Sequence, residues 1–272
     1  MVVIVYNMRR AATRTLFSLS TAYQRKLPPG SYEVIVVDNG SDTPVRPSEV
    51  ERFGPEFKLV TITNAEVSPV KAVNHAVHAS RGDHVGVLFD GARMLSPGVI
   101  SALYETARLG RRSLVSLLGW HLGPDHQSKS ISLGYDEPEE DRLLEAIDWK
   151  TNGYGLFEIS SLETSNPAGW FGPVAESTCF AMPRGVFEEL GGFDERFTSP
   201  GGGLANHEFL QRVARRRDIQ LAVAIGEGTF HQLHGGVSTN STIDRWSEFE
   251  AEYSLITGVP YAWPSIDPWW FL

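Results

Sequence analysis

The chain has 272 residues, of which 42% are hydrophobic, and its formal net charge is −9. This size and hydrophobic content suffice for one substantial core, and ordinary numbers of glycine and proline exclude a fibrous or disordered chain. The acidic balance disfavours a nucleic-acid-binding protein, and the single cysteine, Cys179, rules out an intramolecular disulfide and a multi-cysteine metal site.

The first half alternates short apolar strands with amphipathic helices. The strands lack polar alternation and are rich in β-branched residues, as expected of parallel strands covered on both faces. Between them lie a helix over residues 12–23 and two helices that begin at Ser-Pro pairs, where serine caps the helix and proline takes its first position. The alternation predicts an α/β fold with a mainly parallel sheet and helices on both faces. The predicted strands are residues 2–5, 34–37, 58–62, 85–89 and 114–118.

The second half is less regular. Residues 119–169 are polar and are interpreted as an insertion or flexible cover rather than sheet, with an acidic helix around residues 139–147. An organised block follows and holds a strand near residues 178–182, helices from residue 183 and over 205–217, and a strand near 220–224. Residues 241–255 are predicted to be helical. No internal repeat or low-complexity linker divides the chain, so one domain is the simplest interpretation.

Polar residues follow three of the predicted strands, at the sheet edge where α/β proteins bind ligands. Asp38 could accept hydrogen bonds from a base or ribose, although an Asp-Asn-Gly-Ser sequence is also a common turn former. Asp90 could hold a divalent cation that bridges two phosphates. The three clusters are Tyr6 with Asn7, Asp38 with Asn39, and Asp90 with Gly91.

These clusters, with Lys71 and Asn74 on a helix, the Gly-Gly-Phe-Asp-Glu run at residues 191–195 and a late histidine run, resemble family 2 glycosyltransferases. The resemblance covers roughly residues 2–240. It implies the GT-A fold, a Rossmann-like and mainly parallel sheet. It also implies inverting transfer of a sugar from a nucleotide diphosphate sugar to a hydroxyl acceptor, usually with Mn²⁺ or Mg²⁺. Such transfer serves polysaccharide or glycoconjugate synthesis.

The resemblance also implies an organisation and a donor site. Residues 1–240 would form the GT-A domain, with a nucleotide-sugar half over about 1–118 and an acceptor half over about 170–240. Residues 241–272 would form a C-terminal helix and aromatic tail. Asp38 would contact the nucleoside and Asp90 would serve the metal and diphosphate. The implied nucleotide-sugar-binding residues are Tyr6, Asn7, Asp38, Asn39, Lys71, Asn74, Asp90 and Gly91.

The metal motif departs from the family's Asp-x-Asp, because Ala92 replaces the second aspartate. A late histidine would therefore matter more as a ligand, and neutral imidazole binds manganese acceptably. His231 and His234 are the candidates, with a histidine hydrogen-bonded in the core as the alternative. In an extended segment they would point to opposite faces, and His234 is favoured because it borders a glycine pair that could hinge a closing loop.

The catalytic base is the second departure. Asn206 stands where the family often has an aspartate, and asparagine cannot accept the proton of the acceptor hydroxyl. Glu208 is the nearest carboxylate, with an ion pair to Arg212 as the alternative. Asp194 is the second candidate and His207 the third.

Two further function classes stay open. Ala92 and Asn206 motivate a nucleotide-binding protein that kept the fold and lost transfer activity. A sugar nucleotidyltransferase ranks lower, because residues 6–10 after the first strand are basic but contain no glycine. The same absence of Gly-x-Gly-x-x-Gly disfavours a dinucleotide-dependent oxidoreductase.

Aromatic side chains gather in two late segments. Trp170 and Phe171, with Glu176, precede the acceptor-side strand, where tryptophan could stack on a sugar or pack in the core. The C-terminal aromatics predict a tail that covers the core, or else a contact with a second copy or a membrane surface. They are Trp263, Trp269, Trp270, Phe271 and Leu272.

We expect a cytoplasmic protein, peripheral to a membrane if the tail binds one. The apolar run at residues 2–5 is too short for a signal peptide. No stretch approaches the roughly 20 apolar residues of a membrane span.

Overall fold

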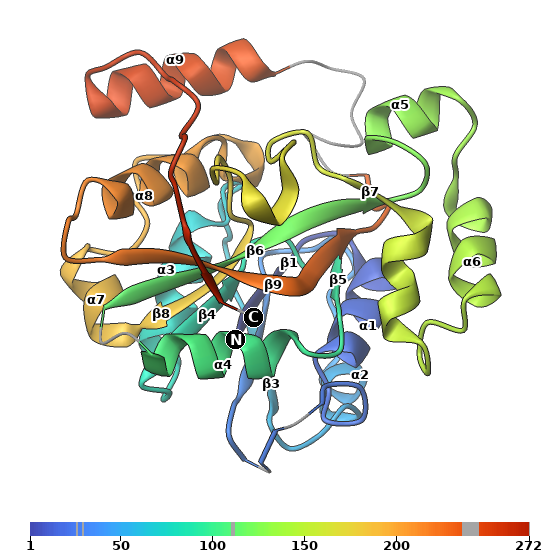
Figure 1. Ribbon diagram of the computed structural model, residues 1–272. Coiled ribbons are helices and arrows are strands. Elements are labelled where there is room, and N and C mark those ends of the chain that lie inside the picture. Colours follow the sequence, from blue (N-terminus) through green and yellow to red (C-terminus); the bar gives the residue numbers. More distant parts are fainter. Residues whose placement is uncertain (26, 29, 110–111, 236–244, 272) are drawn as a thin grey trace.

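The computed structural model describes residues 1–25, 27–28, 30–109, 112–235 and 245–271. Over these residues ten strands form one sheet in the order β10-β9-β6-β8-β4-β1-β2-β3, with β5 paired to β9 and β7 paired to β6 (Figure 1). The strands are β1 (Val2–Val5), β2 (Val34–Asp38), β3 (Phe57–Thr61), β4 (His84–Leu88), β5 (Arg93–Leu95), β6 (Ser113–Leu122), β7 (Ser160–Leu162), β8 (Cys179–Pro183), β9 (Gln220–His231) and β10 (Trp269–Phe271).

The sheet is mainly parallel, as predicted. Strands β1, β2, β3 and β4 pair in parallel, and so do β6, β9 and β10. Strand β8 lies between these two groups and is antiparallel to both β4 and β6. The sequence placed a strand near residues 178–182 but did not predict its insertion into the middle of the sheet.

Both faces of the sheet are covered, because successive residues of β1 point into two different hydrophobic clusters. Val2 and Ile4 face the cluster packed by α3, α7 and α8, and Val3 and Val5 face the one packed by α1 and α4. The helices are α1 (Arg9–Ser18), α2 (Pro47–Glu51), α3 (Val70–Ala79), α4 (Val99–Leu109), α5 (Gln127–Ser132), α6 (Glu137–Ala146), α7 (Arg184–Glu189), α8 (Ala205–Ala214) and α9 (Trp246–Thr257). Short 3₁₀ helices are η1 (Gly153–Ile159), η2 (Gly169–Phe171) and η3 (Pro200–Gly202).

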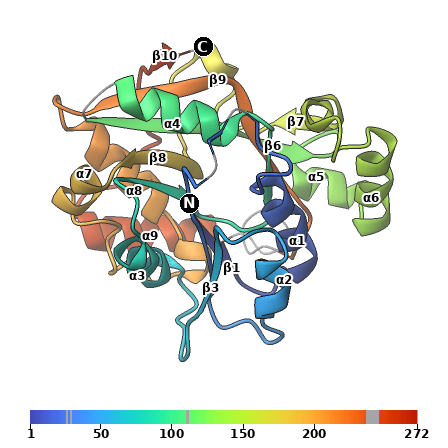
Figure 2. The same cartoon turned by 90° about the horizontal axis from the view of Figure 1, so that it is seen from below.

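The middle segment, residues 119–169, is anchored to the sheet rather than being only a flexible cover. Strand β6 runs into it as far as Leu122, and β7 pairs antiparallel with β6, so the expectation of no sheet was wrong. Helix α6 stands beside α1 (Figure 2). Glu140 of α6, 0% exposed, lies 3.1 Å from both Arg10 and Arg14 of α1.

The C-terminal region crosses the molecule. Helix α9 is capped at its C-terminus by Gly258 in the left-handed conformation. The tail then descends to the sheet, where β10 pairs in parallel with residues 222–224 of β9 (Figure 1). The predicted tail therefore covers a sheet edge. Leu272 lies outside the described residues, and so do residues 241–244 of the predicted helix. Among the helices described, none has the length and apolar character needed to cross a bilayer.

Candidate active site

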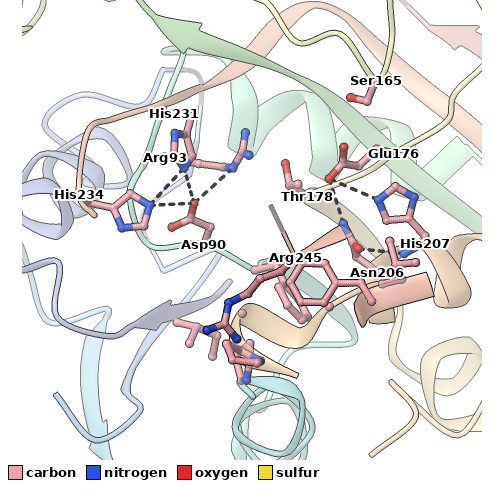
Figure 3. Close-up of a pocket in the computed structure, with 18 of the residues that line it drawn as sticks. Asp90, Arg93, Ser165, Glu176, Thr178, Asn206, His207, His231, His234 and Arg245 are labelled. Carbon is pink, nitrogen blue, oxygen red and sulfur yellow. Dashed lines mark hydrogen bonds and ion pairs between the residues drawn. The ribbon is translucent and has the colours of Figure 1, made fainter. Parts of the chain in front are cut away.

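A cavity of about 730 Å³ opens where the carboxyl ends of β1, β2 and β4 meet β6, β9 and the start of α8. Its lining has two contrasting parts (Figure 3). The histidine end is the group Asp90, His231 and His234. The aromatic end is the group His207, Trp246 and Trp263, which Glu176 borders.

The histidine end brings three potential ligand atoms together. Nε2 of His231 lies 2.8 Å from Oδ2 of Asp90, and Nε2 of His234 lies 3.6 Å from the same oxygen. The two imidazole Nε2 atoms are 3.2 Å apart, and all three side chains converge in Figure 3. The expectation that only one histidine faces the site was wrong, because β9 ends at His231 and the chain then bends.

The charge states suit a cation. Burial lowers the pKa of His231 to about 4 against the opposing effect of Asp90, so its ring is neutral at neutral pH. Burial alone would raise the pKa of Asp90, but His234 and then His231 hold it well below its usual range, so the carboxylate is ionised. One carboxylate and two imidazole nitrogens within 4.8 Å of one another are a fitting donor set for a divalent metal ion.

Ala92 stands where the resembled metal motif has its second aspartate, and its side chain offers no metal ligand. Its backbone N–H instead donates to Oδ1 of Asp90 at 2.9 Å. The additional donor comes from β9 as His231. Gly91 lets this loop dock on β1, since a Cβ atom there would lie 2.3 Å from the carbonyl oxygen of Ile4.

Sequence reasoning missed a buried ion pair next to Asp90. Nη1 of Arg93 lies 2.6 Å from Oε1 of Glu163, and Nε of Arg93 lies 3.9 Å from Oδ2 of Asp90. Both Arg93 and Glu163 line the cavity. The only signal in the sequence was an arginine three residues after Asp90 in an otherwise apolar stretch, and nothing linked it to Glu163.

At the aromatic end, Glu176 is held by two neighbours. Nδ2 of Asn206 donates to its Oε1 at 3.2 Å, and Nε2 of His207 lies 3.7 Å from the same oxygen (Figure 3). Burial would raise the pKa of Glu176, but His207 in particular lowers it below its usual range, so the carboxylate is ionised. Asn206, which replaces the expected aspartate, thus positions a carboxylate that another segment supplies.

The aromatic rings pack as one group, in which only Trp246 and Trp263 are stacked and the other contacts are edge-on. The rings of Trp246 and Trp263 lie 5.2 Å apart and nearly parallel, at 12°. The hydroxyl of Tyr261 and Nδ1 of His207 are 3.0 Å apart. Trp263 is 51% exposed and lines the cavity.

The two carboxylates proposed from the sequence as catalytic bases do not line this cavity. Glu208 makes a bidentate ion pair with Arg212, with Nε–Oε1 and Nη2–Oε2 distances of 2.7 and 2.8 Å. This pair is the alternative that the sequence had offered. Asp194 makes a bidentate pair with Arg196.

Of the proposed donor-binding residues, Tyr6, Asn7, Asn39 and Asp90 line the cavity. Asp38 is fully buried, and its carboxylate accepts from the N–H groups of Ser41 and Val45, both at 2.9 Å. It shapes the turn after β2.

Lys71 and Asn74 are not part of the cavity lining. Lys71 pairs with Glu66 at 2.5 Å on the surface. Asn74 exchanges hydrogen bonds with the backbone of Phe193, joining α3 to the Gly-Gly-Phe-Asp-Glu run.

Comparison with known proteins gives a family and a fold. A family model described as glycosyl transferase family 2 matches residues 1–191. A crystal structure of S. aureus TarS 1–349 in complex with UDP-GlcNAc superposes with a TM-score of 0.61 at 16% identity, covering 94% of this chain and 64% of that one. The TarS 1–349 complex with UDP gives 0.56 at 14% identity, covering 96% and 66%.

The longer TarS structure gives a TM-score of 0.55 at 13% identity and covers 94% of this chain. The present chain spans 42% to 66% of the length of these solved chains. No curated protein matches. At these identities the likeness establishes the fold, which is of the GT-A type.

Proposed function

The chain belongs to glycosyl transferase family 2, and from this premise we propose that it transfers a sugar from a nucleotide diphosphate sugar to a hydroxyl acceptor with inversion. One observation carries the proposal. A single cavity joins the Asp90, His231 and His234 cluster to an ionised carboxylate, Glu176. One end can thus balance the charge of a diphosphate while the other accepts a proton.

The donor is proposed to be a uridine diphosphate sugar that lies along Tyr6, Asn7 and Asn39. The TarS structures in complex with UDP-GlcNAc and UDP support uracil as the nucleobase of the donor. Asp38 would act indirectly, because it holds the N–H of Ser41, whose hydroxyl accepts from the N–H of Asn7 at 2.9 Å. This connection fixes the loops after β1 and β2 against each other.

Asp90, His231 and His234 would hold the divalent cation, Mn²⁺ or Mg²⁺. When bound, such an ion neutralises the charge that develops on the leaving diphosphate. Arg93, buried beside Asp90 and paired with Glu163, adds positive charge near the carboxylate and fixes its surroundings.

Glu176 is proposed as the base. Its carboxylate takes the proton of the acceptor hydroxyl while that oxygen attacks the anomeric carbon and the bond to the diphosphate breaks. No covalent intermediate with the protein forms. Asn206 and His207 orient the carboxylate through contacts at 3.2 and 3.7 Å. Orientation and charge stabilisation then supply the rate gain.

The aromatic end is proposed to receive the acceptor. The exposed face of Trp263, stacked on Trp246, suits the apolar face of a sugar ring, as in polysaccharide or glycoconjugate synthesis. Trp269 is 58% exposed on β10. A contact of the tail with a second copy of the chain or with a membrane surface would use this exposed Trp269 side chain.

The test is sugar transfer and donor hydrolysis with Glu176→Gln beside Glu208→Gln. Removing the base should lower kcat by about 10² to 10⁴ and leave UDP binding intact, because the amide keeps the shape of the side chain. Loss of activity in Glu208→Gln alone would return the role to the residue predicted from sequence. Tight UDP binding without turnover in the unmodified protein would support a nucleotide-binding protein instead.

A further inference from the structure

We propose that Gln127 fixes the orientation and tautomer of His231, and that the resulting site selects metal ions that accept imidazole nitrogen, such as Mn²⁺, Co²⁺ and Zn²⁺, over Mg²⁺ and Ca²⁺. This rests on the proposed function only in taking Asp90, His231 and His234 as a cation site. Gln127 begins α5, in the segment that the sequence suggested was an insertion.

The contacts of Gln127 determine where the proton of His231 resides. Gln127 is fully buried, and its side-chain amide meets His231 twice. Its Nε2 donates to the carbonyl oxygen of His231 at 2.9 Å, and its Oε1 lies 2.6 Å from Nδ1 of His231. A carbonyl oxygen can only accept, so the NH₂ group must face it and the amide oxygen must face Nδ1. Because that oxygen also can only accept, Nδ1 carries the proton.

With its proton on Nδ1, the ring has Nε2 left to bind a cation, and Nε2 is aimed at the other members of the cluster. Nε2 of His231 lies 2.8 Å from Oδ2 of Asp90 and 3.2 Å from Nε2 of His234. A lone pair facing a carboxylate oxygen at this distance is repulsive unless a proton or a metal cation lies between them. Histidine ligands of metals typically donate their other N–H to a second group, as His231 does to Gln127.

The backbone around His231 is held from three helices. The N–H of Leu233 donates to Oε2 of Glu140 in α6 at 2.7 Å. Nε2 of Gln232 donates to the carbonyl of Ala11 and the hydroxyl of Thr15 in α1, both at 3.1 Å. The segment between the two histidines is therefore fixed by α1 and α6, while Gln127 of α5 fixes the ring itself.

The donor set decides the class of ion. Mg²⁺ demands near-ideal octahedral oxygen coordination and keeps its waters, and Ca²⁺ takes oxygen ligands only. Two imidazole nitrogens with one carboxylate suit first-row transition ions and Zn²⁺ instead. Ala92, where the resembled motif has a carboxylate, removes an oxygen donor, and His231 supplies a nitrogen donor.

Isothermal titration of the full chain with Mn²⁺, Co²⁺, Zn²⁺ and Mg²⁺, without nucleotide, tests the ion preference. We expect the first three to bind at least tenfold more tightly than Mg²⁺. Equal or tighter binding of Mg²⁺ would overturn the preference. Sugar transfer that continues with Mg²⁺ in that case would leave the proposed function standing.

Gln127→Leu tests the positioning role. It keeps the volume but removes both contacts, and we expect Co²⁺ affinity to fall by about 10- to 100-fold with a changed visible absorption spectrum of bound Co²⁺. Gln127→Glu keeps an acceptor for Nδ1 of His231, and its Co²⁺ affinity should fall less. Gln211→Leu is the matched control, since Gln211 donates to the carbonyl of Ala262 at 2.8 Å, away from the cluster.

Circular dichroism and the metal-free melting temperature separate unfolding from a local effect in each variant. Unchanged Co²⁺ affinity and spectrum in folded Gln127→Leu would refute the positioning role. If Co²⁺ binding depends on Gln127 but the protein has no transfer activity, the positioning role would be supported and the proposed function would be refuted.

Discussion

The two ends of the cavity are built by different means. At the histidine end, buried polar side chains from α1, α5, α6 and β5 hold the ligands and the backbone between them. At the aromatic end, rings from α8, α9 and the tail pack against one another, and Trp263 remains half exposed. Buried hydrogen bonds fix one geometry, whereas the packing of rings tolerates small shifts. The comparison suggests that charge is handled at a rigid end and the acceptor is recognised at an adaptable one.

The largest effect should come from removing the carboxylate of the rigid end. Asp90→Ala should abolish the Mn²⁺-dependent rise in melting temperature with UDP, because ligands stabilise only the state that binds them. Transfer should fall by about a thousandfold, as when a main electrostatic group is lost. A metal-dependent shift that survives would show that Asp90 is not a ligand. Asp194→Ala, which breaks only the pair with Arg196, is the comparison.

Acid should destabilise the folded chain through His121. Burial, followed by repulsion from His126 and Arg93, lowers the pKa of His121 in the cavity wall to about 3. An unfolded histidine titrates near 6.5, so between these values the unfolded chain binds a proton that the folded chain does not. The stability that the neutral His121 contributes is therefore complete above about pH 6.5 and is lost as the pH falls towards 3. The free energy of unfolding should fall by up to about 1.4 kcal/mol per pH unit in this range.

Urea unfolding of the wild type and His121→Gln between pH 7 and pH 4 measures this slope. The variant should lose less stability on acidification. Identical slopes would show that His121 takes up a proton without unfolding.

The smallest effect is expected at the adaptable end. Trp263→Ala removes one stacked ring, and KM for a saccharide acceptor should rise about three- to tenfold, in line with about 1 kcal/mol per aromatic contact. KM for the donor and kcat should change little in steady-state kinetics. A change in KM for the donor alone would show that Trp263 contacts the donor and not the acceptor, and it would contradict the contrast between the two ends.

The sequence predicted the parallel part of the fold because its signals are local. Continuous apolar runs placed β1 to β4 within about a residue. The Ser-Pro pairs located α3 and α4, but the predicted serine cap of α3 was wrong, because Pro69 occupies its N-cap and no side chain caps it. It could not predict β8 between β4 and β6, since strand order depends on contacts across the chain.

The site was predicted less completely. Asp90, His231 and His234 were named as metal ligands, and the structure brings them together. Gln127 and Glu163 were missed, because a buried polar residue carries no periodic signal and its partner lies 104 or 70 positions away. Glu208 was chosen by register with a family motif, and its pairing with Arg212 could be read from spacing alone.

The buried carboxylate of Glu140 has a consequence for engineering. It joins two arginines of α1 to the amide of Leu233, so α6 forms part of the wall behind the histidines. A chimera in which a short loop replaced residues 123–159 would lose this connection. A replacement segment would need a carboxylate that accepts from the backbone N–H of Leu233 and a glutamine that contacts His231.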